Sequence, residues 1–545
     1  MFDRPGKTSH ERDDFPPYIT HENVEELKEL DGSQEEILFQ NGRPVARSLG
    51  TSKTTRWAVG CLLAFVPGFL RSRLVVGLLQ LLVPSFLRPG PSEPKKLHPT
   101  AWLGKLDLPR GRGVGPCADT VLDGMRGISA LCVVIYHSSL LWFTWDLHEG
   151  YVPGSYEILK LPIIRLFISG PPHVAIFFIV SGYAISYKTL KLIHQGRFDD
   201  VGSTLASSFF RRHPRLFMPA AVVTFFSALM TQMGWYDLQG LPGVAIPTRE
   251  PAHAGSLREQ MVHFAWTEVW NTDPIGQEHA RGGIPRTVEN PYDANLWTLP
   301  IEFNTSMVVF MFLAAFSRVR NRVRMSVAFA LIIYFEYFWA YWALFLFLAG
   351  MLICDLHFEI DDHRSRSAKN MISSEDDVLP IWARVPQGIV SRISRKIAGS
   401  SFFGRITGIS LFTLALWMLS VPEKTYIDTL YTHMGAVVLV LAVDHSTHLQ
   451  IVFTNPISQY LGRISYSLYL IHGPLLWTLG SVLGRRCVAF MGGETNETYV
   501  LGVAMAAFLW WPVAIWVADL TYRGVDSKCV QLARWSYEKL LRKEA

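Results

Sequence analysis

The sequence has few charged residues for its length. Only 18% of its 545 residues are Asp, Glu, Lys or Arg and 49% are hydrophobic, whereas about a quarter of the residues of a soluble domain are charged. The formal net charge of +5 is small, and no basic stripe with interleaved aromatic residues is present, so we exclude a nucleic-acid partner. These shortages favour one large membrane domain over several soluble domains.

Cysteine pairs and metal-ligand spacings are also missing. None of the six cysteines belongs to a CxxC pair, and Cys132 and Cys354 lie inside or at the end of apolar runs. We interpret the cysteines as small apolar filler residues. Because no His, Cys and Asp set has the spacing of a zinc site, the sequence predicts no metal.

The N-terminal region lacks the early apolar core of a signal peptide, so we expect membrane entry through internal segments. Its apolar run, residues 57–87, is interrupted by Arg71 and Arg73. Each half is shorter than the roughly 20 residues of a spanning helix, which favours an interfacial helix or hairpin. The predicted parts are a polar disordered tail, an interfacial segment with a linker, a membrane domain and a cytosolic tail, at 1–55, 56–115, 116–522 and 523–545.

Long apolar runs follow, and they predict an all-α fold, a polytopic membrane bundle of about ten transmembrane helices. The fifth and sixth divide a single run whose length favours two short tilted helices over one long helix. The predicted spans are 127–145, 163–186, 216–235, 296–316, 325–338, 339–355, 405–421, 429–446, 463–483 and 499–520.

Loop charge predicts the orientation. With the N-terminus in the cytosol, the arginine-rich and lysine-rich connections after the second, fourth and sixth spans, including 356–404, are all cytosolic, as is the C-terminal tail. The long loop 236–295 falls on the opposite side. We therefore expect a multi-pass protein of an endomembrane with both termini cytosolic. The sequon at Asn496 then lies in a lumenal loop and is a candidate glycosylation site.

The stretch "LDGMRGISALCVVIYH", residues 122–137, places ionisable residues in an apolar helix. Asp123 and Arg126 stand at its predicted cytosolic entrance, and His137 is about 16 Å deeper, near the midplane. An ionisable side chain at that depth is a functional hypothesis, and a neutral imidazole is suited to act as a general base. The alternative is a histidine that is hydrogen-bonded between helices.

The segment "FFRRHPRLFMP" carries Arg211, Arg212 and Arg215 before the third span. Arginine binds phosphate through two parallel hydrogen bonds, so Arg212 and Arg215, on one helical face, could clamp a phosphorylated donor. The alternative is ordinary anchoring by positive charge on the cytosolic side.

Glu302 in "NLWTLPIEFN" is a carboxylate in an apolar span, which is costly. It could pair with His137 or Arg126, or position an acceptor hydroxyl; the alternative is a structural ion pair between helices. The polar residues that end the eighth span, to which we assign no role, are Asp444, His445 and His448.

Two further segments place polar or small residues inside spans. In "LGRISYSLYLIHGPLL", Ser465, Tyr469 and His472 share one helical face, with interhelical hydrogen bonding as the alternative to a role in substrate binding. In "FFIVSGYAIS", Ser181 and Gly182 permit close backbone approach, either for helix packing, which we favour, or for a thin acyl chain.

In this order, these segments resemble the membrane acyltransferase-3 family of O-acyltransferases. The resemblance rests on "LDGMRG", on the Arg126–His137 spacing, and on "FFIVSGYAI", "RRHPRLFMP", "LWTLPIEF" and "GRISYSLYLIHGPLL". It implies a multi-helix membrane domain, a cytosolic acyl-CoA donor and transfer of acetyl or other acyl groups to hydroxyls. It also implies that Arg126 and His137 are the family's essential pair and that Arg212 and Arg215 match its donor-binding RxxR.

We therefore predict an integral membrane O-acyltransferase, similar in layout to fungal members that act in secondary metabolism. It would move an acyl group, acetyl in the first place, from acyl-CoA to a free hydroxyl of a small natural product or glycolipid-like acceptor. His137 would act as general base or carry the acyl group, and Arg126 would orient His137 or stabilise the oxyanion. The predicted catalytic, donor-binding and substrate-binding residues are His137, Arg126, Asp123 and Glu302; Arg211, Arg212 and Arg215; and Ser181, Tyr469 and His472.

Two alternatives remain from the residues alone. One is a membrane transporter of an acylated or polar solute, in which the intramembrane His, Arg and Glu form a proton relay. It predicts an inverted repeat, and none is visible in the sequence. The other is a non-catalytic membrane binding protein on the same fold.

Overall fold

The computed structural model describes most of the region after residue 117. Predictions for residues 1–55, and for nearly all of 56–115, lie outside the described residues. The described part has no strand, only an isolated bridge between Asn290 and Asp293, which confirms the all-α prediction. The described ranges are 83–85, 118–151, 157–236, 253–272, 290–376, 402–422 and 426–541.

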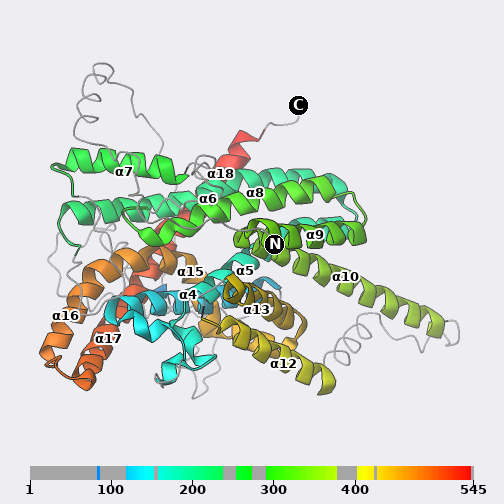
Figure 1. Ribbon diagram of the computed structural model, residues 1–545. Coiled ribbons are helices and arrows are strands. Elements are labelled where there is room, and N and C mark those ends of the chain that lie inside the picture. The colour runs from blue at the N-terminus through cyan, green and yellow to red at the C-terminus, as the bar shows by residue number, and fades with distance from the viewer. Residues whose placement is uncertain are drawn as a thin grey trace, which may run out of the picture. The chain divides into compact units, whose positions relative to one another are not determined.

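Figure 1 shows the helices. Each predicted span corresponds to a helix. Among the described residues, α4, α5, α6, α8, α10, α13 and α17 are long and apolar enough to cross a membrane, and α9, α12 and α15 account for the other three predictions. The helices are α4 Ala118–Trp142, α5 Pro171–His194, α6 Phe198–Gln232, α7 Leu257–Thr272, α8 Thr298–Phe316, α9 Asn321–Trp339, α10 Trp342–Asp376, α12 Phe402–Leu419, α13 Tyr426–His445, α14 Thr447–Thr454, α15 Pro456–Leu475, α16 Ser481–Phe490, α17 Asn496–Thr521 and α18 Ser527–Leu540.

Several predicted boundaries were wrong. Helix α5 begins at Pro171 rather than 163, because its two leading prolines suit the first turn of a helix. Helix α6 begins at Phe198, so the arginines of "FFRRHPRLFMP" lie on the helix itself and not in a connection. Helix α10 continues to Asp376, into the predicted loop 356–404.

The division between the fifth and sixth spans is confirmed. Helix α9 ends at Trp339, and Ala340 adopts a left-handed conformation with φ 50° while its N–H donates to the Glu336 carbonyl. A left-handed residue is the usual end of a helix. Helix α10 then starts at Trp342, but it is long rather than short.

Glycines bring two pairs of helices into backbone contact. A Cβ on Gly127 of α4 would lie 2.3 Å from the Gly462 nitrogen of α15. Likewise, a Cβ on Gly182 of α5 would lie 2.2 Å from the Phe347 carbonyl oxygen of α10, and one on Gly350 would lie 2.0 Å from the Ile179 oxygen. Gly182 therefore serves helix packing, as the sequence favoured.

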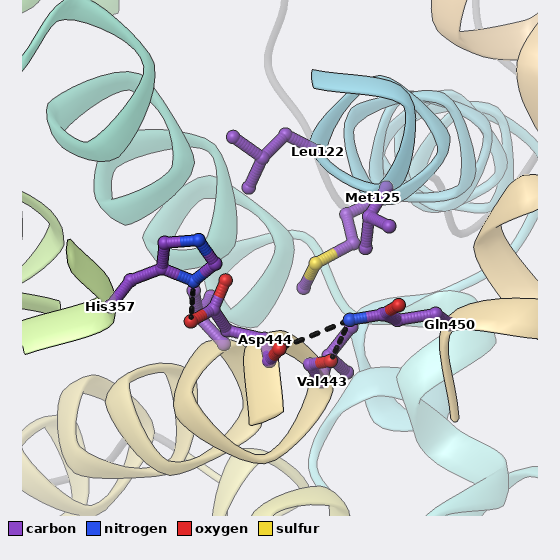
Figure 2. Close-up of a pocket in the computed structure, with 8 residues that line it drawn as sticks. Leu122, Met125, His357, Val443, Asp444 and Gln450 are labelled. Carbon is purple, nitrogen blue, oxygen red and sulfur yellow. Dashed lines mark hydrogen bonds and ion pairs between the residues drawn. The ribbon is translucent and has the colours of Figure 1, made fainter. Parts of the chain in front are cut away.

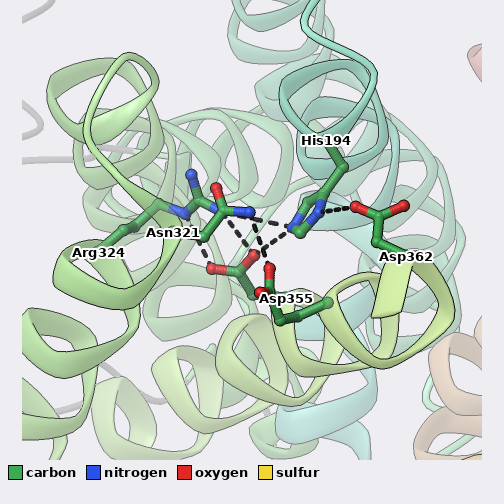
Figure 3. A network of polar contacts seen from close by, with 6 residues as sticks. His194, Asn321, Arg324, Asp355 and Asp362 are labelled. Atoms are coloured by element: carbon green, nitrogen blue, oxygen red, sulfur yellow. Dashed lines mark hydrogen bonds and ion pairs between the residues drawn. The ribbon is translucent and has the colours of Figure 1, made fainter. Parts of the chain in front are cut away.

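A buried network of charges joins α5, α9 and α10 (Figure 3). Arg324, which is fully buried, donates to both oxygens of Asp355, at 2.8 and 2.6 Å. The His194 ring lies between two carboxylates, with Nε2 2.8 Å from Asp355 and Nδ1 2.9 Å from Asp362. Because carboxylate oxygens accept, both ring nitrogens carry a proton, and two cations here balance two anions.

Candidate active site

His137 is one ionisable residue of α4 that makes no hydrogen bond in the described part of the chain. It is half-buried, and within the described part of the chain it makes no hydrogen bond or ion pair. Its ring centroid lies 5.2 Å from that of Tyr136 and 5.1 Å from that of His472. The alternative of a histidine hydrogen-bonded between helices is therefore not what the structure shows. His137 lies about 10 Å beyond the midpoint of α4, nearer to its far end than the sequence predicted.

His472 on α15 presents an unused nitrogen beside His137. Its side chain is fully buried, and Nδ1 lies 2.5 Å from the Tyr469 carbonyl oxygen. A carbonyl oxygen only accepts, so Nδ1 carries the hydrogen and Nε2 of the neutral ring holds a lone pair. Nε2 is buried and has no hydrogen-bond partner among the described residues. Two imidazoles that each have an unpaired hydrogen-bonding nitrogen within the described chain therefore lie side by side where α4 and α15 pack together.

Arg126 is similarly unpartnered, but at the other end of α4. Its Nε is buried without a hydrogen bond in the part of the chain that the structure describes. Arg212 and Arg215 of α6 are close enough to interact with it electrostatically, as is Asp526 beyond α17. The charges around Arg126 are therefore mainly positive. The sequence predicted that Arg126 orients the His137 ring. Because the two residues are about 16 Å apart along α4, Arg126 is not placed to do so.

Glu302 pairs with neither His137 nor Arg126. Its Oε1 accepts from Arg212 Nη2 at 2.8 Å and from Ser181 Oγ at 3.3 Å. Arg212 is buried, and its Nε donates to Ser306 Oγ at 3.0 Å. The structure thus shows the interhelix ion pair that was the alternative for Glu302. The hydrogen bonds of Glu302 join α5, α6 and α8, and one of them comes from the predicted substrate residue Ser181.

The other predicted residues at the arginine end are dispersed. Arg215 is exposed while Arg212 is held inside, so the two do not point together as a free clamp. Arg211 Nε donates to the Ser207 carbonyl of its own helix at 3.0 Å. Asp123 is exposed in the first turns of α4, far along the helix from His137.

Tyr469 fastens α15 to the segment before α8. Its hydroxyl donates to the Asn295 carbonyl and bonds Thr298 Oγ1 at 2.6 Å. Its ring also lies 5.7 Å from that of His472. Asn496, the predicted glycosylation site, is exposed as the first residue of α17, and Thr498 of its sequon takes part in a capping box with Thr495.

Two carboxylates near these helices were not predicted. Asp444 was assigned no role, yet it accepts from Tyr183 at 3.0 Å and from His357 Nδ1 at 2.9 Å. With Gln450 it lines a cavity of about 40 Å³ beside Met125 (Figure 2). Asp293 is buried against Gly473, the residue after His472. The signal for Asp444 was a carboxylate at the end of an apolar run; Asp293, in a polar loop segment, gave none.

Comparison with known proteins agrees with this architecture. The family described as an acyltransferase domain matches residues 119–517. The O-acetyltransferase PaAT-1 of Phomopsis amygdali is 44% identical over 475 residues, covering 83% of this chain and 87% of that protein. Acyltransferase R4 of Phoma sp. is 21% identical over 76% of this chain and 96% of its own length. Acyltransferase clz18 of Cochliobolus lunatus is 21% identical over 69% and 83%, respectively. No solved structure matches.

Proposed function

The chain belongs to the acyltransferase-3 family and is an O-acyltransferase, and we propose that it transfers an acetyl group from acetyl-CoA to a free hydroxyl of a small molecule, with His137 as the base. The observation that carries the proposal is the pairing of His137 with His472. His137 makes no hydrogen bond in the described part of the chain, and His472 makes one through Nδ1 but none through Nε2. Unsatisfied imidazoles inside an apolar bundle are costly, so their retention supports a role in the chemistry.

In this mechanism, His137 accepts the proton of the acceptor hydroxyl as that oxygen attacks the thioester carbonyl. The new C–O bond forms, the C–S bond of the donor breaks, and the proton passes from His137 to the departing CoA thiolate. His472 was predicted as a substrate-binding residue; we propose that its Nε2 lone pair instead accepts the remaining N–H of His137. This bond would fix the tautomer and orientation of the base, as a carboxylate does in other catalytic histidine pairs.

The donor would bind near Arg126 of α4 and Arg215 of α6. Arg126 and Arg215 contribute positive charge that the neighbouring carboxylates do not fully balance, because Glu302 is engaged by Arg212. Arginine suits the diphosphate and 3′-phosphate of CoA. The pantetheine arm of CoA separates those phosphates from the thioester, which agrees with the distance between Arg126 and His137 along α4. We therefore assign Arg126 to the donor nucleotide.

We further propose a multi-pass arrangement in an endomembrane, with the Phe198 end of α6 and both termini in the cytosol. Positive charge concentrates at that end, as the positive-inside rule requires. Asn496 would then be lumenal and available for glycosylation. For the acceptor we propose a hydroxylated natural product or a glycolipid-like molecule.

The test is single-turnover release of CoA thiol from acetyl-CoA by the protein in nanodiscs, with a lipid and metabolite extract of the host as the source of acceptor. We expect release that depends on the extract and is lost in His137→Ala, with an acetylated product found by mass spectrometry. His445→Ala, which changes an exposed histidine at the end of α13, is the control. Equal release by both variants would remove His137 from the mechanism. A protein that binds acetyl-CoA but releases no thiol would contradict the proposal.

A further inference from the structure

Helix α7 has its polar face inward and its apolar face outward. Gln260 is fully buried and donates to Tyr292 at 2.8 Å, and the Glu268 carboxylate accepts from Thr224 at 2.8 Å. The opposite face exposes Val262, Trp266, Val269 and Trp270, with 60% of Trp270 accessible. A helix at a water-exposed surface has the reverse pattern. This inversion is typical of a helix surrounded by lipid.

The helix also lies along α6, a helix long and apolar enough to span a membrane (Figure 1). The chain leaves the Gln232 end of α6, where His253 donates to the Gln232 carbonyl at 3.2 Å. Phe264 then contacts Phe225, with ring centroids 5.7 Å apart. At the end of α7, His213 Nε2 donates to the Thr272 carbonyl at 3.0 Å.

These contacts measure how far α7 reaches. From Gln232 to His213 is about 28 Å along α6 at 1.5 Å per residue, close to the ~30 Å thickness of the hydrocarbon layer. The chain is back at the starting end by Tyr292, whose carbonyl accepts from Ser227 Oγ at 2.7 Å. Thr272 is therefore beside His213, and Tyr292 is beside Ser227, toward the Gln232 end of α6.

We propose that α7 is a re-entrant membrane helix whose Val262, Trp266, Val269 and Trp270 face contacts lipid acyl chains. The outward Phe225 and Phe226 of α6 continue the same apolar surface. The polar face of α7 is satisfied by α6 and by Tyr292, which is what burial of polar groups within a membrane demands. The predicted lumenal loop 236–295 is thus in part a membrane element, and an even number of crossings is preserved.

The proposal is independent of the acyl transfer reaction and is tested without it. The full chain is reconstituted in nanodiscs that contain a phosphatidylcholine with a diazirine midway along one acyl chain. After irradiation, adducts are mapped by peptide mass spectrometry. We expect adducts on Val262 and Trp266 at a yield within about two-fold of that on Phe225 and Phe226, since they flank Phe264, which contacts Phe225, and would lie at similar depth.

Labelling of Phe225 and Phe226 without labelling of α7 would overturn the proposal, and so would adducts on the inward Gln260 or a lack of adducts on both helices. A second measurement uses Val269→Asp, which we expect to lower the yield of monodisperse protein several-fold, because a carboxylate would face hydrocarbon. Leu540→Asp, which changes an exposed apolar residue at the end of α18, is the control and should not change the yield. Equal yields for both variants would count against lipid contact.

Discussion

Two histidine-containing groups of ionisable side chains in the described part of the protein differ in how far each is satisfied. Both nitrogens of His194 and both oxygens of Asp355 are occupied by charged partners. At the second group, His137 and Nε2 of His472 make no such bond within the described chain. In the first group each charge has a partner of opposite sign, although Arg324 Nη1 makes no hydrogen bond among the described residues. In the proposed mechanism, the second group gains its remaining partners from the substrates.

This contrast separates groups that hold the fold from groups available for reaction. A buried network in which each charge is paired stabilises the fold, because removal of one partner leaves the other charge buried and unpaired. An unsaturated pair contributes little to the fold, so its removal should spare stability. Mutations at the first site should therefore lower stability, and mutations at the second should lower turnover while stability is kept.

The largest expected effect is on stability, at the buried network of Arg324, Asp355 and His194. Asp355→Asn should lower the free energy of unfolding by about 3–5 kcal/mol, because Arg324 would remain buried without a carboxylate. The measurement is thermal unfolding in detergent. Asp199→Asn is the matched control, since its pair with Arg318 is exposed and worth at most about 1 kcal/mol. If Asp355→Asn unfolds with the wild-type profile, the network does not hold the fold.

The next effect is on turnover at the unsaturated pair. His472→Asn can keep the donor to the Tyr469 carbonyl but has no group in place of Nε2, whereas the longer His472→Gln can place an amide oxygen there. We expect the Asn variant to lose on the order of 10²-fold in kcat, with an unchanged KM for acetyl-CoA, and the Gln variant to recover part of the loss. Equal loss in both, accompanied by a lower Tm, would indicate that His472 only supports packing.

A smaller change should follow at Arg126. Arg126→Met removes a charge that repels Arg212 and Arg215 and attracts only Asp526 among the neighbours described above, so the Tm should stay the same or rise. The KM for acetyl-CoA should increase about 10- to 100-fold, the cost of a hydrogen bond to a charged group of about 1.5–3 kcal/mol. Arg322→Met, at an exposed position on α9, is the control. An unchanged KM would move the donor nucleotide away from Arg126.

The smallest effect concerns His148, a buried histidine outside the spanning helices. Burial, assisted by the charge of Arg165 and opposed by nearby backbone carbonyls, lowers its pKa to about 4. The unfolded chain therefore binds a proton that the folded chain does not, between about pH 6.5 and 4. Its contribution to stability is complete above that window and falls as the pH drops through it. His148→Gln should reduce the fall of Tm between pH 7 and 4.5; an identical slope would contradict this assignment.

The sequence predicted the helices well and their contacts poorly. Apolar runs located a helix at each of the ten predicted spans, and seven of the described helices are long and apolar enough to cross a membrane, because the requirement for long apolar segments acts locally. The break at Ala340 followed from length alone. In contrast, the partner of Glu302 depends on the rotation of three helices about their axes, which no local pattern specifies. Helix α7 was missed because it is short and its polar face is satisfied by α6 and by Tyr292, contacts that its own sixteen residues do not reveal.

The candidate site was predicted in the same uneven way. Arg126, His137 and His472 were identified as ionisable residues within apolar runs. Arg126 lies toward one end of α4, and His137 and His472 form an imidazole pair near the other. The distance along α4 could be predicted from residue spacing, whereas the contact between α4 and α15 could not. Asp293, in contact with Gly473, lies in an irregular polar segment, where sequence periodicity gives no indication of burial.

The glycine contacts between α4 and α15 have a consequence for how substrates reach the imidazoles. Where Gly127 meets Gly462, backbone touches backbone, and a slide of either helix past the other would bring main-chain atoms into collision. A carrier that alternates between two faces of a membrane depends on such movements. In the proposed mechanism the two rings lie on helices that are packed backbone to backbone, so donor and acceptor would move to the histidines while the histidines stay in place.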